Sequence, residues 1–279
     1  MISFFEALST NPLLLSAIIA GFLASIVSGV VGSYVVVKRI VFISGSISHS
    51  VLGGIGLFLW LERSQGVEWA SPLIGALLAA VLSALIIGWI HLNYRQREDT
   101  VIAALWSIGM ALGVLFIHLT PGFNVELTNF LIGNILWVTP DDLLLLTCLD
   151  LFVLAVVILL NKRFLAICFD EEQAQLQGLS LNRLYLFLLV LIAISIVLLI
   201  QVVGIILVMT MLTIPSAIAN LASSRLSLIM VLAVIISAAT TFLGIAVSYQ
   251  LDWPSGATIA LLAGIFYLMA LLVKKKSLG

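Results

Sequence analysis

Apolar residues fill long blocks of this chain, and short clusters of charged and turn-forming residues separate the blocks. A helix needs roughly 20 apolar residues to cross the hydrocarbon core of a bilayer, and every backbone polar group inside must be satisfied by the helix itself. The pattern therefore predicts nine membrane-spanning helices. They cover approximately residues 12–37, 43–61, 70–92, 101–118, 141–160, 184–200, 202–220, 227–249 and 255–273.

Three parts of this pattern are less regular. The blocks 43–61 and 184–200 are short, so eight spans remain an alternative, and an even number would move the N-terminus to the other side. The stretch from 119 to 140 is half apolar and is bracketed by Pro121 and Pro140. We interpret it as a short helix that lies on the bilayer or dips into it.

Composition supports a membrane protein and excludes several other classes. Apolar residues make up 63% of the chain and charged residues 9%, and the mean hydropathy is +1.29. No soluble domain of this size has such values. The formal net charge of −1 leaves no basic excess for nucleic acid, and Cys148 and Cys168 form no ligand or disulfide motif. We predict an all-α, polytopic integral membrane protein with a single transmembrane domain over residues 1–279.

Lysine and arginine positions predict the orientation, because cytoplasmic loops hold these residues in excess. If residue 1 faces outward, eleven of the twelve cations face the cytoplasm, and only Arg63 lies outside. The C-terminus is then cytoplasmic. The sequence also lacks a GxxxxGK[ST] phosphate loop, so this chain cannot bind ATP by that route. Energy for transport must come from a partner or from a gradient.

Polar residues interrupt the second predicted helix in a regular way. On a helix, three of them share one face with a glycine, and two further glycines extend that face. One interpretation is helix packing, because small residues let membrane helices approach closely. The other is an ion pathway, since imidazole is the commonest side-chain ligand for transition metals and one histidine suits a transit site completed by a symmetry mate. The face holds Ser46, His49, Ser50 and Gly53, with Gly45 and Gly56 beside them.

Two further features concern helix geometry. Gly109 and Gly113 form a GxxxG pattern, which indicates close helix packing. Pro215 breaks the hydrogen-bond ladder of the seventh span, and we expect Thr210 and Thr213 to satisfy the freed carbonyl groups. Kinked helices of this kind often border pathways.

Asp150 is the one acidic residue well inside a predicted span. It is either a proton or cation carrier, or a neutral carboxyl group that is bonded to a neighbouring helix. The longest hydrophilic stretch, residues 161–184, falls on the cytoplasmic side. Ala174 and Gly178 lie four residues apart in it, so they form a smooth patch on a short helix. That helix is either a solvated loop or a docking element for a cytoplasmic partner.

Six motifs in sequence order resemble the permease subunits of the metal-ion ABC importers. They are "GSYVVVKRIVFISGSISHSVLGGIGL", "REDTVIAALWSIGMALGVLF", "FLIGNILWVTPDDLL", "FDEEQAQLQGLSLNRL", "VVGIILVMTMLTIPSAIANL" and "LDWPSGATIALLAGIFYLMALL". The resemblance implies a type II-like importer permease in the bacterial plasma membrane, with no enzyme activity of its own. It also implies a separate cytoplasmic ATP-binding subunit, an extracytoplasmic metal-binding protein and a second permease subunit, identical or paralogous. Zinc, manganese or iron(II) would be the substrate, with no permanently bound cofactor.

The resemblance also implies roles for individual residues. The family's second-helix pattern, approximately G-D-A-[IL]-[SA]-H-[AS], aligns with residues 44–50. His49 is kept as a metal contact, but the aspartate position is Gly45. Ser46 and Ser50, or a paralogous partner, would then have to supply oxygen ligands. This departure weakens the case for a carboxylate-assisted manganese site.

The resemblance assigns two other sites. The ATPase-coupling helix matches Phe169 to Gly178, with Phe169, Asp170, Ala174 and Gly178 as candidate contacts, and Pro215 lies in the family's L-[LI]-x-P gating helix. An alternative class is a gradient-driven carrier or channel for a divalent cation that uses Asp150 and His49. An intramembrane hydrolase has little support, because no base-orienting group or oxyanion donor can be located.

Overall fold

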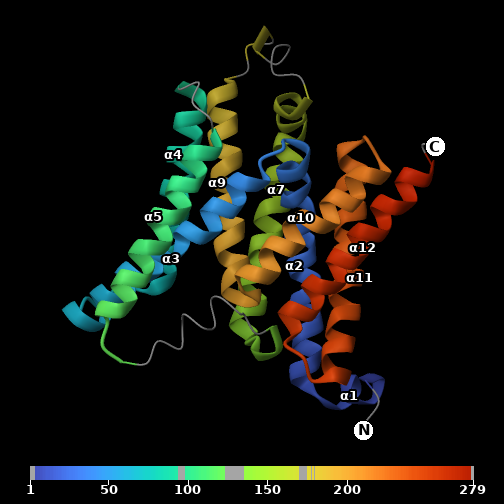
Figure 1. Cartoon of the computed structure of the whole chain (residues 1–279), viewed down its shortest axis with the longest axis horizontal. Coiled ribbons are helices and arrows are strands. Elements are labelled where there is room, and N and C mark those ends of the chain that lie inside the picture. The colour runs from blue at the N-terminus through green and yellow to red at the C-terminus, as the bar shows by residue number, and fades with distance from the viewer. Residues whose placement is uncertain are drawn as a thin grey trace. The chain divides into compact units, whose positions relative to one another are not determined.

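The computed structural model describes residues 4–93, 98–122, 135–169, 175–176, 178 and 180–277. These residues form helices joined by short connections, with no strand among them (Figure 1). The helices are α1 (Phe4–Thr10), α2 (Pro12–Val37), α3 (Val41–Gln65), α4 (Pro72–Asn93), α5 (Glu98–Leu119), α7 (Pro140–Phe169), α9 (Leu181–Val203), α10 (Ile205–Ala222), α11 (Leu226–Leu251) and α12 (Ser255–Ser277), with a 3-10 turn η1 (Ile135–Trp137).

The nine predicted spans are confirmed in the described part of the chain. Nine of its helices are long and apolar enough to cross a membrane, from α2 through α12 without α1. The short blocks 43–61 and 184–200 are complete spans, because α3 and α9 extend beyond them at both ends. Most of the stretch from 119 to 140 lies outside the described residues, so its predicted surface helix stays a prediction.

Local sequence explains where several helices begin. The Asn11 side chain accepts a hydrogen bond from the amide of Leu13 and caps α2, whose first residue is Pro12. Thr139 and Asp142 cap α7 reciprocally: Asp142 Oδ2 accepts from the Thr139 amide at 3.0 Å, and the Asp142 amide donates to Thr139 Oγ1 at 3.3 Å.

The chain divides into two compact units. Unit 1 comprises Met1–Arg39, Glu126–Ile158 and Leu198–Gly279, and unit 2 comprises Ile40–Val125 and Leu159–Val197. Helices α7 and α9 each contribute residues to both units. The prediction of one transmembrane domain over the whole chain stays a prediction.

Unit 1 is built around α2, which packs against α10 and α11, while α12 packs against both of these helices (Figure 1). Glycines on α2 set the spacing. A Cβ atom on Gly29 would lie 2.6 Å from the backbone nitrogen of Val234, and one on Gly32 would overlap the carbonyl oxygen of Leu212. The backbones of α2, α10 and α11 therefore touch, as small residues allow in membrane proteins.

In unit 2, α3 packs against both α4 and α5 (Figure 1). The predicted packing role of the GxxxG pattern is confirmed. A Cβ atom on Gly53 would lie 2.9 Å from the carbonyl oxygen of Gly109, and one on Gly56 would lie 2.7 Å from that of Gly113. These two glycine pairs bring the backbones of α3 and α5 into contact.

Pro215 lies buried inside α10, as predicted, but the expectation for its threonines is wrong. A proline leaves the carbonyl four residues earlier, here that of Met211, without its helical donor. Thr210 Oγ1 donates instead to the carbonyl of Ile206 at 3.0 Å, and Thr213 Oγ1 to that of Met209 at 2.7 Å. Each hydroxyl reaches the carbonyl four residues before it, because that is where a helical threonine points.

Candidate functional site

The polar face of α3 is largely buried inside unit 2. Ser46 and Ser50 are buried and hydrogen-bonded to other groups of this unit, and Gly45 is buried as well. Ser46 Oγ donates to the carbonyl oxygen of Ile102 on α5 at 2.9 Å. Ser50 Oγ lies 2.8 Å from Ser83 Oγ on α4. The hydroxyl of Ser46 therefore links α3 to α5, and that of Ser50 links α3 to α4. Both residues act as packing contacts in this unit.

His49 differs from these serines because it is only half-buried. Its imidazole ring stacks on the indole ring of Trp106, with 4.2 Å between ring centroids and 10° between ring planes. Trp106 comes from α5, the helix whose glycines touch α3. The contact therefore covers one face of the imidazole.

Trp106 is held in turn by its own helix. The indole Nε1–H donates to Met110 Sδ at 3.0 Å, one helical turn further along α5. Trp106 is not among the site residues predicted from the sequence. A signal was present, since Trp106 precedes Gly109 by three residues and Gly113 by seven, which places all three on one helix face.

Protein ligands around His49 are few. Among the described residues, no group of three or more histidine, cysteine or acidic side chains is arranged to hold a metal ion. Ser46 and Ser50 are buried against Ile102 of α5 and Ser83 of α4, and Gly45 has no side chain. Within this part of the chain, His49 is therefore the ligand-type side chain that the polar face of α3 offers.

Asp150 lies in unit 1 on the buried face of α7, with 4% of its surface exposed. Neither carboxylate oxygen has a hydrogen-bond partner among the described residues. The backbone of Val27 on α2 lies within electrostatic reach of the carboxyl group, but the geometry of a hydrogen bond is not met. Both predicted roles of Asp150, a carrier and a neutral carboxyl group bonded to a neighbouring helix, stay predictions.

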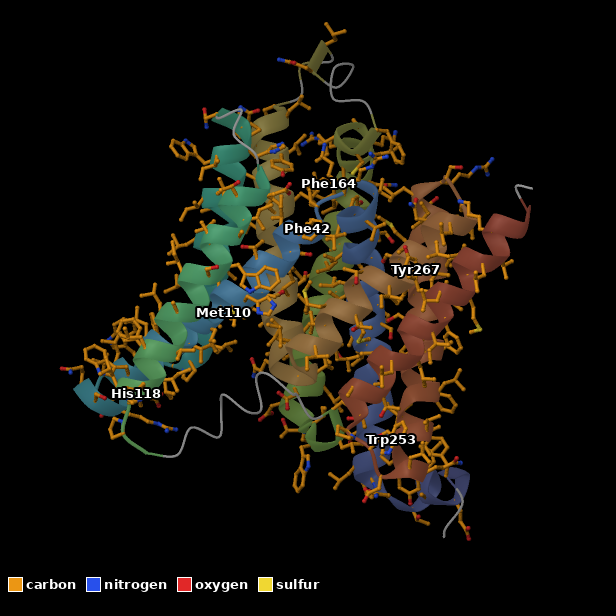
Figure 2. The ribbon with its side chains drawn as sticks, in the orientation of Figure 1. Phe42, Met110, His118, Phe164, Trp253 and Tyr267 are labelled. Atoms are coloured by element: carbon orange, nitrogen blue, oxygen red, sulfur yellow. The ribbon has the colours of Figure 1, made fainter. Side chains whose placement is uncertain are left out.

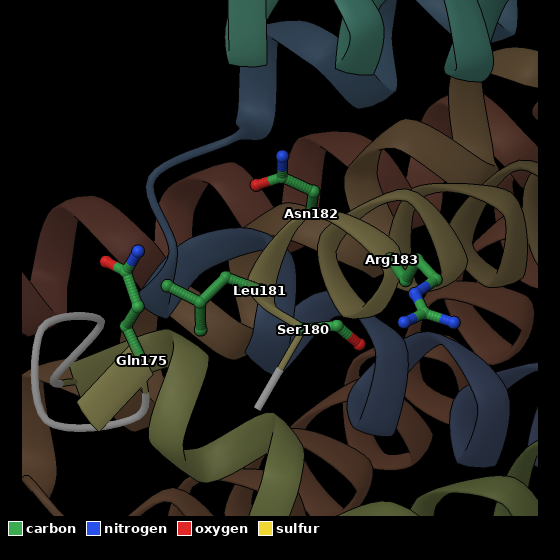
Figure 3. Close-up of a pocket in the computed structure, with 5 residues that line it drawn as sticks. All are labelled: Gln175, Ser180, Leu181, Asn182 and Arg183. Atoms are coloured by element: carbon green, nitrogen blue, oxygen red, sulfur yellow. The ribbon is translucent and has the colours of Figure 1, made fainter. Parts of the chain in front are cut away.

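The predicted coupling segment is described only in part. Phe169 is the last residue of α7 and is exposed, whereas Asp170 and Ala174 lie outside the described residues. Gly178 has a φ of +78°, a left-handed conformation that favours glycine, and its amide donates to the carbonyl of Gln175 at 3.0 Å. Beside this turn, the start of α9 borders a depression (Figure 3). Its lining residues are Gln175, Ser180, Leu181, Asn182 and Arg183.

Sequence comparisons cover almost the whole chain. The profile of the ABC 3 transport family matches residues 10–274. A "Probable metal transport system membrane protein" from Chlamydia trachomatis is 49% identical over 264 residues, which are 95% of this chain and 90% of that protein. The "Manganese transport system membrane protein MntC" of Halalkalibacterium halodurans is 33% identical over 273 residues, 98% of this chain and 91% of that one.

A solved structure shares the fold. PsaBC from Streptococcus pneumoniae, in complex with Fab, superposes with a TM-score of 0.83 at 30% identity, covering 96% of this chain and 94% of that one. The fold class predicted from the hydrophobic blocks is thereby confirmed, and so is the resemblance drawn from the six motifs.

Proposed function

This chain belongs to the ABC 3 transport family, and we propose that it is the membrane-spanning permease subunit of an importer that moves a divalent transition metal ion by ATP hydrolysis on a separate subunit. It is a multi-pass membrane protein with nine candidate spans in its described part. The names of its relatives, one a metal transport protein and one a manganese transport protein, support a metal ion as substrate.

The partners follow from what the sequence holds and lacks. It has no phosphate loop, so in the proposed importer a separate cytoplasmic ATP-binding subunit supplies the energy. We assign its docking to the segment from Phe169 to Gly178. An extracytoplasmic metal-binding protein delivers the ion on the other side.

The orientation places residue 1 outside and the C-terminus in the cytoplasm. The distribution of lysine and arginine supports it, because eleven of twelve then face the cytoplasm. The arrangement of unit 1 agrees with an odd number of spans, since the N-terminal helix α1 and the end of α12 lie at opposite ends of this unit (Figure 1).

A second permease subunit completes the metal site. The polar face of α3 offers one imidazole, and one ligand is too few to hold a transition metal. A two-fold dimer places two copies of the same residue near its axis. Two His49 side chains, or His49 and the matching residue of a paralogue, then form the transit site.

Transport proceeds by alternating exposure of this axial site. ATP-driven closure of the two ATPases pulls on the coupling segments, rocks the helical bundles and opens the path outward to the loaded binding protein. The return step opens the path inward. His49 acts as a transient ligand, and weak binding allows the ion to leave.

The observation that carries this proposal is the environment of His49: a half-buried imidazole on a helix face whose serine hydroxyls are already hydrogen-bonded. The test is metal uptake by the assembled transporter in proteoliposomes, with His49→Ala and the control His118→Ala at the end of α5. We expect His49→Ala to lower uptake at least about tenfold, as loss of a ligand should, and His118→Ala to have no effect. Normal uptake by His49→Ala would falsify the ligand role.

A gradient-driven carrier is the second candidate, and the partnerless carboxylate of Asp150 is the observation that favours it. The two candidates differ in their energy source. Uptake that requires ATP and is unaffected by collapsing the ion gradients supports the importer. Uptake without an ATP-binding subunit supports the carrier.

A further inference from the structure

We propose that Trp106 is a positioning residue for the metal: its indole ring holds the imidazole of His49 in the plane that the passing ion requires. This inference rests on the proposed ligand role of His49. It adds a residue from α5 to a site that the sequence placed on α3 alone.

The stacking geometry restricts the imidazole in one particular way. The rings are nearly parallel, with 10° between their planes and 4.2 Å between centroids. The terminal torsion of a histidine side chain is broad and weakly restrained by itself. A flat neighbour at this distance prevents the ring from rotating out of plane, so the directions of its two ring nitrogens become fixed.

A restrained plane matters because a metal ion binds imidazole through a nitrogen lone pair that lies in the ring plane. Trp106 covers a face of the ring and does not itself block the ring edge, where the nitrogens lie. The indole face is also electron-rich, so it attracts an imidazole that carries positive charge or donates electron density to a cation. The stack therefore favours the metal-bound form of His49 over the free form.

The position of Trp106 is set by contacts on both sides of it along α5. Four residues earlier, the carbonyl of Ile102 accepts the hydrogen bond from Ser46 at 2.9 Å. Three residues later, Gly109 touches the backbone of α3, where a Cβ atom would collide with Ser50. These contacts fix how α3 and α5 are aligned.

The indole ring is fixed within this alignment. Its Nε1–H donates to Met110 Sδ at 3.0 Å. Figure 2 shows Met110 on the middle part of α5. His49 thus stacks on a ring that is held at its own polar atom.

Trp106 has a simpler competing explanation, which is that it only fills space between α3 and α5. The same helix pair provides a matched control. Trp60 on α3 packs against Phe116 on α5, with 5.8 Å between centroids and 44° between ring planes. Trp60→Leu removes an indole from the same helix pair without touching His49.

The experiment compares Trp106→Phe, Trp106→Leu, Trp60→Leu and His49→Ala in the assembled transporter in proteoliposomes. Initial rates of zinc and manganese uptake give the half-saturating concentration and the maximal rate. We expect Trp106→Leu to raise the half-saturating concentration about tenfold, the scale found for groups that orient metal ligands. Trp106→Phe keeps an aromatic face and should stay within about twofold of wild type, as should Trp60→Leu.

Each of the other outcomes contradicts either the ligand role of His49 or the positioning role of Trp106. Equal half-saturating concentrations for Trp106→Leu and Trp60→Leu make Trp106 a space-filling residue and overturn the proposal. If His49→Ala transports normally, the ligand role itself fails, whatever Trp106 does. If Trp106→Leu does not assemble while Trp60→Leu does, Trp106→Met is measured instead. Failure of that variant too assigns Trp106 a structural role and also overturns the proposal.

Discussion

The buried serines of α3 in unit 2 differ from three buried polar residues of unit 1. On α3 in unit 2, the buried hydroxyls of Ser44, Ser46, Ser48 and Ser50 all have hydrogen-bond partners. In unit 1, polar side-chain atoms remain buried without a partner among the described residues. They belong to Asp150, Ser216 and Thr241.

The difference matters for stability. A buried polar group without a hydrogen-bond partner lowers the unfolding free energy by about 1–3 kcal/mol, whereas a hydrogen-bonded one raises it by about 1 kcal/mol. The hydroxyls of Ser46 and Ser50 therefore help to hold unit 2 together, because they bond to α5 and α4. The three groups of unit 1 weaken it instead. Substitutions of like chemistry at these positions should then have opposite effects.

The largest effect should come from the glycine contacts on which both units depend. In unit 1, a Cβ atom on Gly32 would overlap the carbonyl oxygen of Leu212, whereas in unit 2 one on Gly53 would lie 2.9 Å from that of Gly109. Gly32→Ala should lower the unfolding free energy by about 3 kcal/mol, because backbone cannot move aside as a side chain can. Gly53→Ala should lower the unfolding free energy by a smaller amount. The measurement is thermal unfolding of the purified permease.

Gly264→Ala is the control for these variants. A Cβ atom there meets nothing within 4 Å, so the change should be neutral or should stabilise α12 by up to about 1 kcal/mol through helix propensity. A larger loss for Gly53→Ala than for Gly32→Ala would contradict the ranking of the two contacts.

An effect of opposite sign is expected at Asp150. Asp150→Asn keeps the shape of the side chain and removes the cost of burying a carboxylate without a partner. The unfolding free energy should rise by on the order of 1 kcal/mol, and ATP-driven uptake should be kept. Lower stability would mean that the carboxylate has a stabilising partner, and lost uptake would mean that it acts in transport.

The smallest effects come from a matched serine pair, one in each unit. Ser46→Ala removes a hydrogen bond to the carbonyl of Ile102 and should cost about 1 kcal/mol of stability. Ser216→Ala removes a buried hydroxyl without a partner and should cost nothing or add stability. Equal losses at the two positions would remove the contrast between the units. Metal selectivity should stay unchanged in both variants, which thermal unfolding and uptake assays can check together.

Much of the fold could be predicted from the sequence because hydrocarbon imposes a length and a composition on every span. The predicted seventh and eighth spans, 202–220 and 227–249, lie within a few residues of α10 and α11. The apolar pattern predicts the fifth span at 141–160, but α7 continues to Phe169. Hydropathy marks the residues that can lie in the hydrocarbon core, but it does not mark the end of the helix. The backbone hydrogen bonds of α7 continue past Lys162 and Arg163, because a helix can extend into a polar environment.

The site could be predicted only in part, for a physical reason. Periodicity places Ser46, His49 and Ser50 on one face of their helix, which follows from 3.6 residues per turn. It does not say which of them a neighbouring helix will cover. That depends on how α3 and α5 align, and the stack of Trp106 on His49 is a product of that alignment.

The turn between α11 and α12 bears on how the protein is made. Asp252 has a φ of 55°, and the Ser248 hydroxyl donates to the carbonyl of Trp253 at 2.6 Å, so the reversal is closed by its own residues. Figure 2 shows Trp253 at the end of unit 1 where α1 lies. A connection this short does not let α11 cross the bilayer while α12 remains outside it. We therefore expect α11 and α12 to enter the bilayer together, as a preformed hairpin, during synthesis.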